Sequence, residues 1–366
     1  MPKIRKAVEE DPQQAAEAAG LRYVTDQKPG FGRRKRGEAF AYYDQNGNRV
    51  KDAGKIQRIR SIVIPPAWKR VWICPSANGH LQATGFDARG RKQYKYHSTW
   101  RVVRDEAKFE RLHLFAGVLP KIRAKVDRDM RRPGLGREKV IATVVRLLEV
   151  SLIRVGNEEY AKENRSFGLS TLRNRHVEIN GSTVKFHFRG KSGKEHTVGV
   201  FDRRVARIVQ RCQDLPGQHL FEYKDEEGRI APIASEDVND YLQTITNQPF
   251  TAKDFRTWAG TVLAAIALSK MQEVDSETVA KKNILTAIEA VARLLGNTVA
   301  IYRKCYIHPA VPTSYLNGTL AQNLRARADS QIASHLHKLK PEEAAVLSLL
   351  RQELADRSKK GRPSKR

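Results

Sequence analysis

The stretch RHVEINGSTVKFHFRGKSGKEHTVGV, residues 175–200, alternates apolar with polar side chains, as β-strands with one buried face do. Three of its runs, RHVEIN, STVKFHF and KEHTVGV, predict three short strands. Asn180-Gly181 is the two-residue turn expected between the first two strands, and RGKSGK is the longer turn between the last two. We therefore expect a three-stranded sheet with Lys191 projecting from a hairpin tip.

A helical pattern precedes this sheet. Apolar residues recur there at three- and four-residue spacing, which predicts one core-facing stripe that ends at Gly156. The stripe consists of Val140, Ile141, Val144, Leu147, Leu148 and Val155. Arg154 is accordingly expected in the last turn of the helix.

Two long helices follow the sheet. Thr251 and Asp254 form a capping box that opens the helix KDFRTWAGTVLAAIALSK. A second helix runs through ILTAIEAVARLL and is expected to end at Gly296-Asn297. Residues 104–325 are therefore predicted to form a mostly α-helical domain that carries the small sheet.

Residues 21–103 show a different pattern, in which short alternating runs are separated by turn residues. The turn pairs are Asn46-Gly47, Asn78-Gly79 and Arg89-Gly90. We expect a small antiparallel β-sheet domain here. The predicted fold class is α+β, with this N-terminal sheet domain followed by the larger, mostly α-helical domain and its three-stranded sheet.

The last strand of the N-terminal sheet, residues 91–97, has no apolar face. One face carries Lys92, Tyr94 and Tyr96, and the other carries Arg91, Gln93, Lys95 and His97. At least one face is therefore expected to meet a partner rather than a core. Basic residues interleaved with aromatic ones suit contact with a nucleic-acid backbone, although an ordinary exposed edge strand has the same composition.

Both ends of the chain lie outside these domains. Residues 1–20 form an N-terminal extension in which Asp11, Pro12 and Gly20 predict the start and end of a short helix. Residues 326–366 form a basic C-terminal extension. Its last part, RQELADRSKKGRPSKR, has few apolar residues near its end and is predicted to be disordered and available for phosphate contact.

The net charge points to a polyanionic partner. The 366 residues include 67 Lys and Arg against 40 Asp and Glu, which gives a formal charge of +27. Nucleic acid is the first candidate, and a basic but merely solvated surface is the alternative. An anionic membrane is disfavoured because the sequence contains no long apolar run.

Cysteine usage and the first residues favour the cytoplasm. Cys74, Cys212 and Cys305 are too few and too scattered for a disulfide framework or a zinc site. The start, MPKIRKAVEEDP, has basic residues with no apolar segment after them, so no signal peptide is expected.

A set of separated polar residues suits chemistry at a phosphodiester: Arg154, Lys191, Arg256, Asn297 and Tyr306. Transesterification at phosphorus adds negative charge to the non-bridging oxygens, and guanidinium groups donate paired hydrogen bonds to such oxygens at any working pH. A lysine can protonate the leaving oxygen, and a tyrosine can serve as the nucleophile. Neither a metal nor another cofactor is required by this scheme.

Each member alone has a simpler explanation. Either arginine could pair with an acidic residue, a lysine on a hairpin tip is usually only solvated, and a tyrosine in a helical segment usually packs in a core or lies on the surface. Only the joint pattern favours chemistry.

The chain resembles the type IB DNA topoisomerases of the compact, poxvirus-like kind, and most of all their bacterial members, from about Leu21 to Leu320. The matching segments are LIRVGNEEYAKEN, GLSTLRNRHVEI with the hairpin after it, KDFRTW and GNTVAIYRKCY. The resemblance implies that Arg154 and Arg256 are the two catalytic arginines, Lys191 the general acid, Asn297 a phosphate ligand and Tyr306 the nucleophile.

The same resemblance implies the DNA contacts. GRKQYKYH is similar to the DNA-contacting strand of the family, which gives Arg91, Gln93, Tyr94 and Tyr96 roles in recognising duplex DNA. Two more expected DNA contacts are Tyr160, near Arg154, and Lys253, beside Arg256.

The activity implied is that of a monomeric clamp around double-stranded DNA. Such an enzyme relaxes supercoils without ATP or metal by transient single-strand cleavage, through a 3′-phosphotyrosyl intermediate, strand rotation and religation. A nucleoid-associated protein in a bacterial cytoplasm is implied as well.

One departure and two rivals accompany this interpretation. Viral members carry histidine where this chain has Asn297, which still donates a hydrogen bond but carries no charge. A tyrosine recombinase would share the catalytic residues, but such enzymes usually have histidine where Lys253 stands. A non-catalytic DNA-binding protein would explain the charge and leave the joint pattern unexplained.

Overall fold

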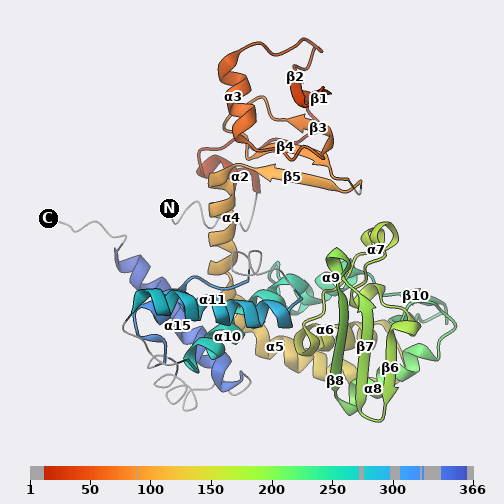
Figure 1. Ribbon diagram of the computed structural model, residues 1–366. Helices are drawn as coiled ribbons and strands as arrows, with labels where there is room; N and C mark the ends of the chain where they lie inside the picture. Colours follow the sequence, from red (N-terminus) through yellow and green to blue (C-terminus); the bar gives the residue numbers. More distant parts are fainter. Residues whose placement is uncertain are drawn as a thin grey trace. The chain divides into compact units, whose positions relative to one another are not determined.

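The computed structural model describes residues 12–88, 90–271, 276–296, 306–321, 324 and 339–360 (Figure 1). The chain divides into two compact units, Met1–Glu110 and Arg111–Arg366. The first contains a five-stranded antiparallel sheet, and the second is mostly helical with a three-stranded sheet. The predicted α+β class is confirmed.

The sheet of the first unit has the strand order β2-β1-β3-β4-β5, so β2 and β5 are its edges. Its strands are β1 (Phe31–Arg36), β2 (Ala39–Tyr43), β3 (Lys69–Ile73), β4 (Leu81–Phe86) and β5 (Lys92–Tyr96). Neighbouring strands pair antiparallel throughout. In the turn between β4 and β5, Gly90 has a φ of 77°, as the turn pattern predicts, whereas Arg89 lies outside the described residues.

Among its described residues, the first unit also contains three helices: α2 (Pro12–Ala18), α3 (Ala53–Ser61) and α4 (Ser98–Glu110). The predicted N-terminal helix is confirmed from Pro12 onward, and Asp11 lies outside the described residues. Helix α3 was not predicted. It begins after Asp52, whose carboxylate accepts a hydrogen bond from the Lys55 backbone N–H at 2.7 Å, and it buries Ile59 against the sheet.

The second unit is built on one continuous hydrophobic core. The helices in its described ranges are α5 (Leu112–Met130), α6 (Arg137–Ser151), α7 (Glu158–Asn164), α8 (Arg203–Gln213), α9 (Ser235–Thr246), α10 (Ala252–Ser269), α11 (Glu277–Leu294), α13 (Ala310–Leu316) and α15 (Pro341–Lys360). The capping box predicted at the start of α10 is present, because Asp254 accepts a hydrogen bond from the Thr251 backbone N–H at 2.7 Å.

The predicted three-stranded sheet is confirmed as β6 (Val177–Asn180), β7 (Thr183–Arg189) and β8 (Glu195–Phe201). Its first turn lies one residue later than predicted: Asn180 pairs with Thr183, so the loop is Gly181-Ser182. Gly181 takes the positive φ, 57°, that this tight loop requires. A two-stranded ribbon of β9 (Glu222–Lys224) and β10 (Ile230–Pro232) completes the unit.

The prediction that Arg154 lies in the last turn of a helix is wrong. Helix α6 ends at Ser151, because Leu152 adopts a left-handed φ of 56° that no continuing helix permits. Arg154 lies beyond that end, in a segment whose carbonyl groups accept hydrogen bonds from the Leu169 and Ser170 backbone N–H groups at 2.8 and 2.6 Å.

The prediction of a disordered basic end is wrong for residues 351–360, which continue helix α15. The residues just before them explain this, because Val346, Leu347 and Leu350 are fully buried in the core of the second unit. A helix nucleated by buried side chains can extend through polar residues. Residues 361–366 lie outside the described part of the chain.

None of the helices in the described ranges combines the length and the apolar character needed to span a membrane.

Candidate active site

A pocket in the second unit brings together three of the five residues assigned to chemistry from the sequence. It is bordered by the segment after α6, the tip of the β7–β8 hairpin, α10 and the end of α11, and its titratable lining residues are Arg154, Lys191, His196 and Arg256. Segments distant in the sequence thus supply one cationic pocket.

Arg256 lies in the second turn of α10 and is only 5% exposed. Its guanidinium donates hydrogen bonds to the backbone oxygen of Leu152 and, at 2.7 Å, to that of Leu295. These carbonyls stand at the C-terminal ends of α6 and α11, where the helix dipole favours a cation. They orient the guanidinium without neutralising its charge.

Tyr306 stands beside Arg256. The centroid of its ring lies 5.7 Å from Cζ of Arg256, and the half-buried side chain packs on the core of the unit. The Thr261 hydroxyl of α10 donates a hydrogen bond to the Tyr306 backbone oxygen at 3.3 Å and accepts one from the His308 backbone N–H at 3.1 Å. Tyr306 lies in a turn rather than in a helix, and α10 holds both it and Arg256.

A tight crossing of two backbone segments fixes Arg154. Gly156 has a φ of 100°, and a Cβ added to Gly168 would lie 2.6 Å from the Arg154 backbone oxygen. Both positions therefore require glycine, one for its conformation and one for close approach. The Arg154 side chain is half-buried.

Lys191 is exposed at the hairpin tip, as the sequence predicts. It opens the short 3₁₀ turn Lys191–Gly193, in which Ser192 has a left-handed φ of 67°. Asn297 lies outside the described residues, but Gly296 before it is described and has a φ of 61°. The helix end predicted at this point is confirmed.

Two further residues of this unit are expected to contact DNA, and each lies close in sequence to a residue that lines the pocket. Tyr160 is half-buried on α7, and its backbone N–H donates to the Asn157 side-chain oxygen at 2.8 Å. Lys253 is exposed in the first turn of α10.

In the first unit, edge strand β5 carries the other predicted DNA contacts. Arg91 and Gln93 both donate hydrogen bonds to the Asp87 carboxylate, at 2.8 and 3.1 Å. Tyr94 is 48% exposed and stacks on Tyr96, with 6.1 Å between ring centroids. Sequence reasoning missed Asp87, which precedes the predicted turn and offsets part of the charge of Arg91.

His196 is a pocket residue that sequence reasoning also missed. It lies on β8, and burial lowers its pKa, as do the positive charges of Arg154, Arg256 and Lys194; Glu195 acts in the opposite direction. The signal was available in the sequence, because alternation places His196 on the same strand face as Val198 and Val200.

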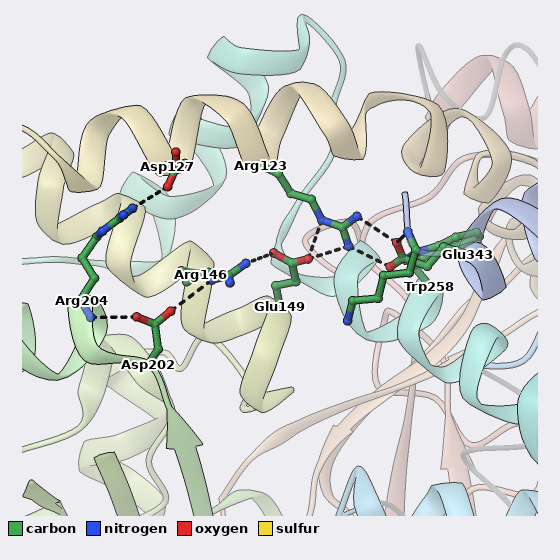
Figure 2. A network of polar contacts seen from close by, with 9 residues as sticks. Arg123, Asp127, Arg146, Glu149, Asp202, Arg204, Trp258 and Glu343 are labelled. Atoms are coloured by element: carbon green, nitrogen blue, oxygen red, sulfur yellow. Dashed lines mark hydrogen bonds and ion pairs between the residues drawn. The ribbon is translucent and has the colours of Figure 1, made fainter. Parts of the chain in front are cut away.

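A buried polar network connects the C-terminal helix to the helix that carries Arg256 (Figure 2). Arg123 of α5 donates hydrogen bonds to Glu343 of α15 at 2.8 and 2.9 Å and to Glu149 of α6 at 2.6 Å. Trp258 of α10 donates to Glu343 at 3.4 Å. Burial alone would raise the pKa of Glu343, but the hydrogen bonds and charge of Arg123, together with the hydrogen bonds from the Lys340 backbone and Trp258, lower that pKa overall.

Within the part of the chain that the structure describes, no three His, Cys, Asp or Glu side chains gather closely enough to hold a metal ion.

Two family models match the chain. The eukaryotic DNA topoisomerase I catalytic core matches residues 97–323, and the bacterial DNA topoisomerase IB N-terminal domain matches residues 39–87. Together they match residues in both units of the structure.

Individual relatives agree with these models. DNA topoisomerase 1B of Acanthamoeba polyphaga mimivirus is 33% identical over 285 residues, which cover 76% of this chain and 85% of the viral protein. DNA topoisomerase 1B of vaccinia virus (strain Copenhagen) is 23% identical over 61% of this chain and 68% of its own length. DNA topoisomerase 1 of Mycosarcoma maydis is 25% identical over 50% of this chain and 20% of its own length.

Proposed function

The chain belongs to the type IB DNA topoisomerase family, whose members are isomerases that act on DNA, and we propose that it relaxes supercoiled duplex DNA by transient cleavage of one strand. The observation that carries this proposal is the pocket that joins Arg154, Lys191 and Arg256, with the Tyr306 ring beside Arg256. A phosphodiester in this pocket would meet two guanidinium groups, an ammonium group and a phenol.

The reaction exchanges one phosphorus–oxygen bond for another. The phenolic oxygen of Tyr306 attacks phosphorus and loses its proton to solvent, while the bond to the 5′ oxygen breaks. A 3′-phosphotyrosyl bond forms, and Lys191 gives the leaving oxygen its proton, so that a 5′-hydroxyl remains. The reverse attack by this hydroxyl reseals the strand. Because one ester bond replaces another, the cycle needs no ATP.

The non-bridging oxygens are assigned to fixed cations and one neutral donor. Arg256, oriented by the Leu152 and Leu295 carbonyls, and Arg154 would each present a guanidinium to them. Asn297 would add an amide hydrogen bond without charge. The two guanidinium groups take the role of charge stabilisation, so the scheme calls for neither a metal nor another cofactor.

DNA binding is assigned to both units of a monomer that closes as a clamp on the duplex. Edge strand β5 would contribute Arg91, Gln93, Tyr94 and Tyr96, and the second unit would contribute Tyr160 and Lys253. We propose a place beside the nucleoid in a bacterial cytoplasm because the proposed substrate is duplex DNA; the match of residues 39–87 to a bacterial domain supports only the bacterial origin.

The experiment uses supercoiled plasmid with EDTA and without nucleotide. Relaxation is expected, and quenching with SDS should trap protein on DNA 3′ ends. Tyr306→Phe removes only the hydroxyl, so the adduct should disappear while DNA binding persists. A plasmid that stays supercoiled would refute the enzymatic proposal. Recombination between two sites by a tetramer would instead favour a tyrosine recombinase.

A further inference from the structure

A half-buried histidine lies on the inward face of the small sheet, at the edge of the pocket. His196 shares one face of β8 with Val198 and the buried Val200. It pairs with Phe188 of β7, and the two rings stack with centroids 5.3 Å apart and planes within 13°. An imidazole thus stands where the strand pattern calls for an apolar side chain, next to Arg154 and Arg256 in the pocket.

Two glycines leave room for this ring. A Cβ added to Gly190 would lie 2.5 Å from Cδ2 and 2.7 Å from Nε2 of His196. A Cβ added to Gly296 would lie 2.3 Å from Cε1 and 3.1 Å from Nε2. The shortest distance at each glycine, 2.5 and 2.3 Å, is far inside van der Waals contact, so the imidazole ring packs directly against both glycine positions.

Each of these glycines immediately precedes a residue assigned to the reaction. Gly190 comes before Lys191, and Gly296 comes before Asn297. The ring therefore sets the distance between the hairpin tip and the end of α11. We propose that His196 is a positioning residue: its flat ring acts as a spacer that holds Lys191 where it can protonate the leaving oxygen. This inference rests on the proposed function of the pocket.

The charged groups around the His196 ring are consistent with a spacer role, in which the shape of the ring matters and its charge does not. Arg154 faces it from the segment after α6, Arg256 from α10, and Lys194 and Glu195 from the hairpin. Burial is the largest cause that lowers the pKa of His196 and the neighbouring cations are the next, so the pocket favours the neutral imidazole. A neutral ring adds no charge that would compete for the phosphate.

Two substitutions separate shape from chemistry. His196→Ala removes the spacer, whereas His196→Phe keeps a flat ring that can stack on Phe188. At saturating DNA, the His196→Ala variant should have a single-turnover cleavage rate roughly 10- to 100-fold below that of the wild type, as expected when a catalytic group loses its positioning. The His196→Phe variant should have a cleavage rate within a few-fold of the wild type. Both variants should bind DNA with wild-type affinity. A Phe variant as slow as Ala would overturn the role as a spacer.

A modified DNA tests whether the effect passes through Lys191. When sulfur replaces the leaving 5′ oxygen, the departing thiolate needs no proton, because a thiol is far more acidic than an alcohol. Lys191→Ala and His196→Ala should then both cleave at nearly the wild-type rate. A His196→Ala enzyme that remains slow on the sulfur substrate would contradict action through the lysine.

Gly190→Ala provides a second approach that leaves the histidine in place. Its methyl group would clash with the ring, so it should show the same defect on normal DNA and the same rescue by sulfur. In the His196→Ala background, Gly190→Ala should lower the cleavage rate only slightly further. A double-mutant cycle measures this difference. Independent, additive defects would refute the shared contact.

The wild-type enzyme distinguishes failure of the proposed function from failure of the positioning role of His196. A wild-type enzyme that forms no adduct on either substrate would refute the proposed function itself. A wild-type enzyme that cleaves both, beside a His196→Ala variant that matches it on normal DNA, would refute only the positioning role.

Discussion

At the scale of single residues, the orientation of Arg256 depends on two backbone oxygens, those of Leu152 and Leu295. A guanidinium can donate to both and still present N–H groups to a phosphate, because its donors lie in a planar fork. Lysine has a single donor atom. The Arg256 position is therefore expected to tolerate no other cation.

Arg256→Lys should lower the single-turnover cleavage rate about 10²- to 10³-fold, which is the usual cost of losing a fixed donor to a developing oxyanion. DNA affinity should change little, because the net charge is preserved. Rapid-quench cleavage and a binding titration measure the two quantities. Near-normal cleavage by the lysine variant would mean that the carbonyl contacts do not define the donor.

Two buried histidines, His80 and His176, and the half-buried His196 predict an acid-sensitive fold. Burial lowers the pKa of His80, His176 and His196 below 6.5, and for His176 and His196 nearby cations add to this effect. The folded state then binds fewer protons than the unfolded state just below pH 6.5. The stabilisation is fully present above that pH and declines as the pH falls towards the folded-state pKa values.

Urea unfolding at pH 7.5 and pH 5.5 measures this loss. The free energy of unfolding should be lower at pH 5.5, and the difference between the two pH values should shrink in the His196→Phe variant. An unchanged difference in that variant would exclude His196 as one of the groups that titrate on unfolding.

At the scale of elements, helix α15 is attached to α10 through a buried carboxylate. Glu343 receives hydrogen bonds from Arg123 and Trp258, and Trp258 lies two residues after Arg256. The C-terminal helix therefore helps to hold α10, which carries Arg256, in position, although the sequence predicted only a basic C-terminal extension.

Glu343→Gln should destabilise the second unit by about 1–3 kcal/mol, because it leaves Arg123 with a weaker buried partner. Glu342→Gln, at the exposed neighbouring position of the same helix, is the matched control and should change stability by about 0.5 kcal/mol or less. Thermal or urea unfolding compares them. Equal effects of the two substitutions would argue against the buried network.

Local sequence signals predicted many elements and missed those that depend on tertiary packing. The Thr251–Asp254 capping box and the alternation in residues 175–200 are short-range patterns, and both predictions are confirmed. Helix α3 buries little besides Ile59, so its sequence carries almost no periodic signal. The end of α6 at Leu152 was missed because a left-handed leucine has no sequence signature.

The same limit applies to the candidate site. Arg154, Lys191 and Arg256 follow from recognisable segments, and the structure gathers them into one pocket. Strand alternation places His196 on the inward face, but its position in the pocket could not be predicted, because its contact with Gly296 joins residues a hundred positions apart. The assignment of Asn297 stays a prediction, since it lies outside the described residues.

At the scale of the whole molecule, the C-terminal region combines a structural part with a basic end. Val346, Leu347 and Leu350 are each fully buried. Burial of such side chains contributes roughly 1.5–3 kcal/mol apiece, which together approach the about 5–15 kcal/mol that stabilises a typical domain. The helix is therefore part of the folded unit.

Two truncations separate these parts. Ending the chain at residue 340 should prevent stable folding of the second unit, seen as loss of its cooperative melting transition. Ending it at residue 360 should leave the melting temperature unchanged and remove only the basic stretch GRPSKR. If that stretch contacts phosphates, DNA binding by the chain that ends at residue 360 should depend less steeply on salt than binding by the full chain. A folded 340-residue product would contradict the structural role.

The contact of His196 with two glycines also restricts how this sequence can diverge. Residues 190, 196 and 296 share one small volume, so a larger side chain at either glycine position is compatible only with a smaller one at position 196. We expect these three positions to change together among relatives, and a library that randomises all three should recover compensated combinations that single substitutions never reach.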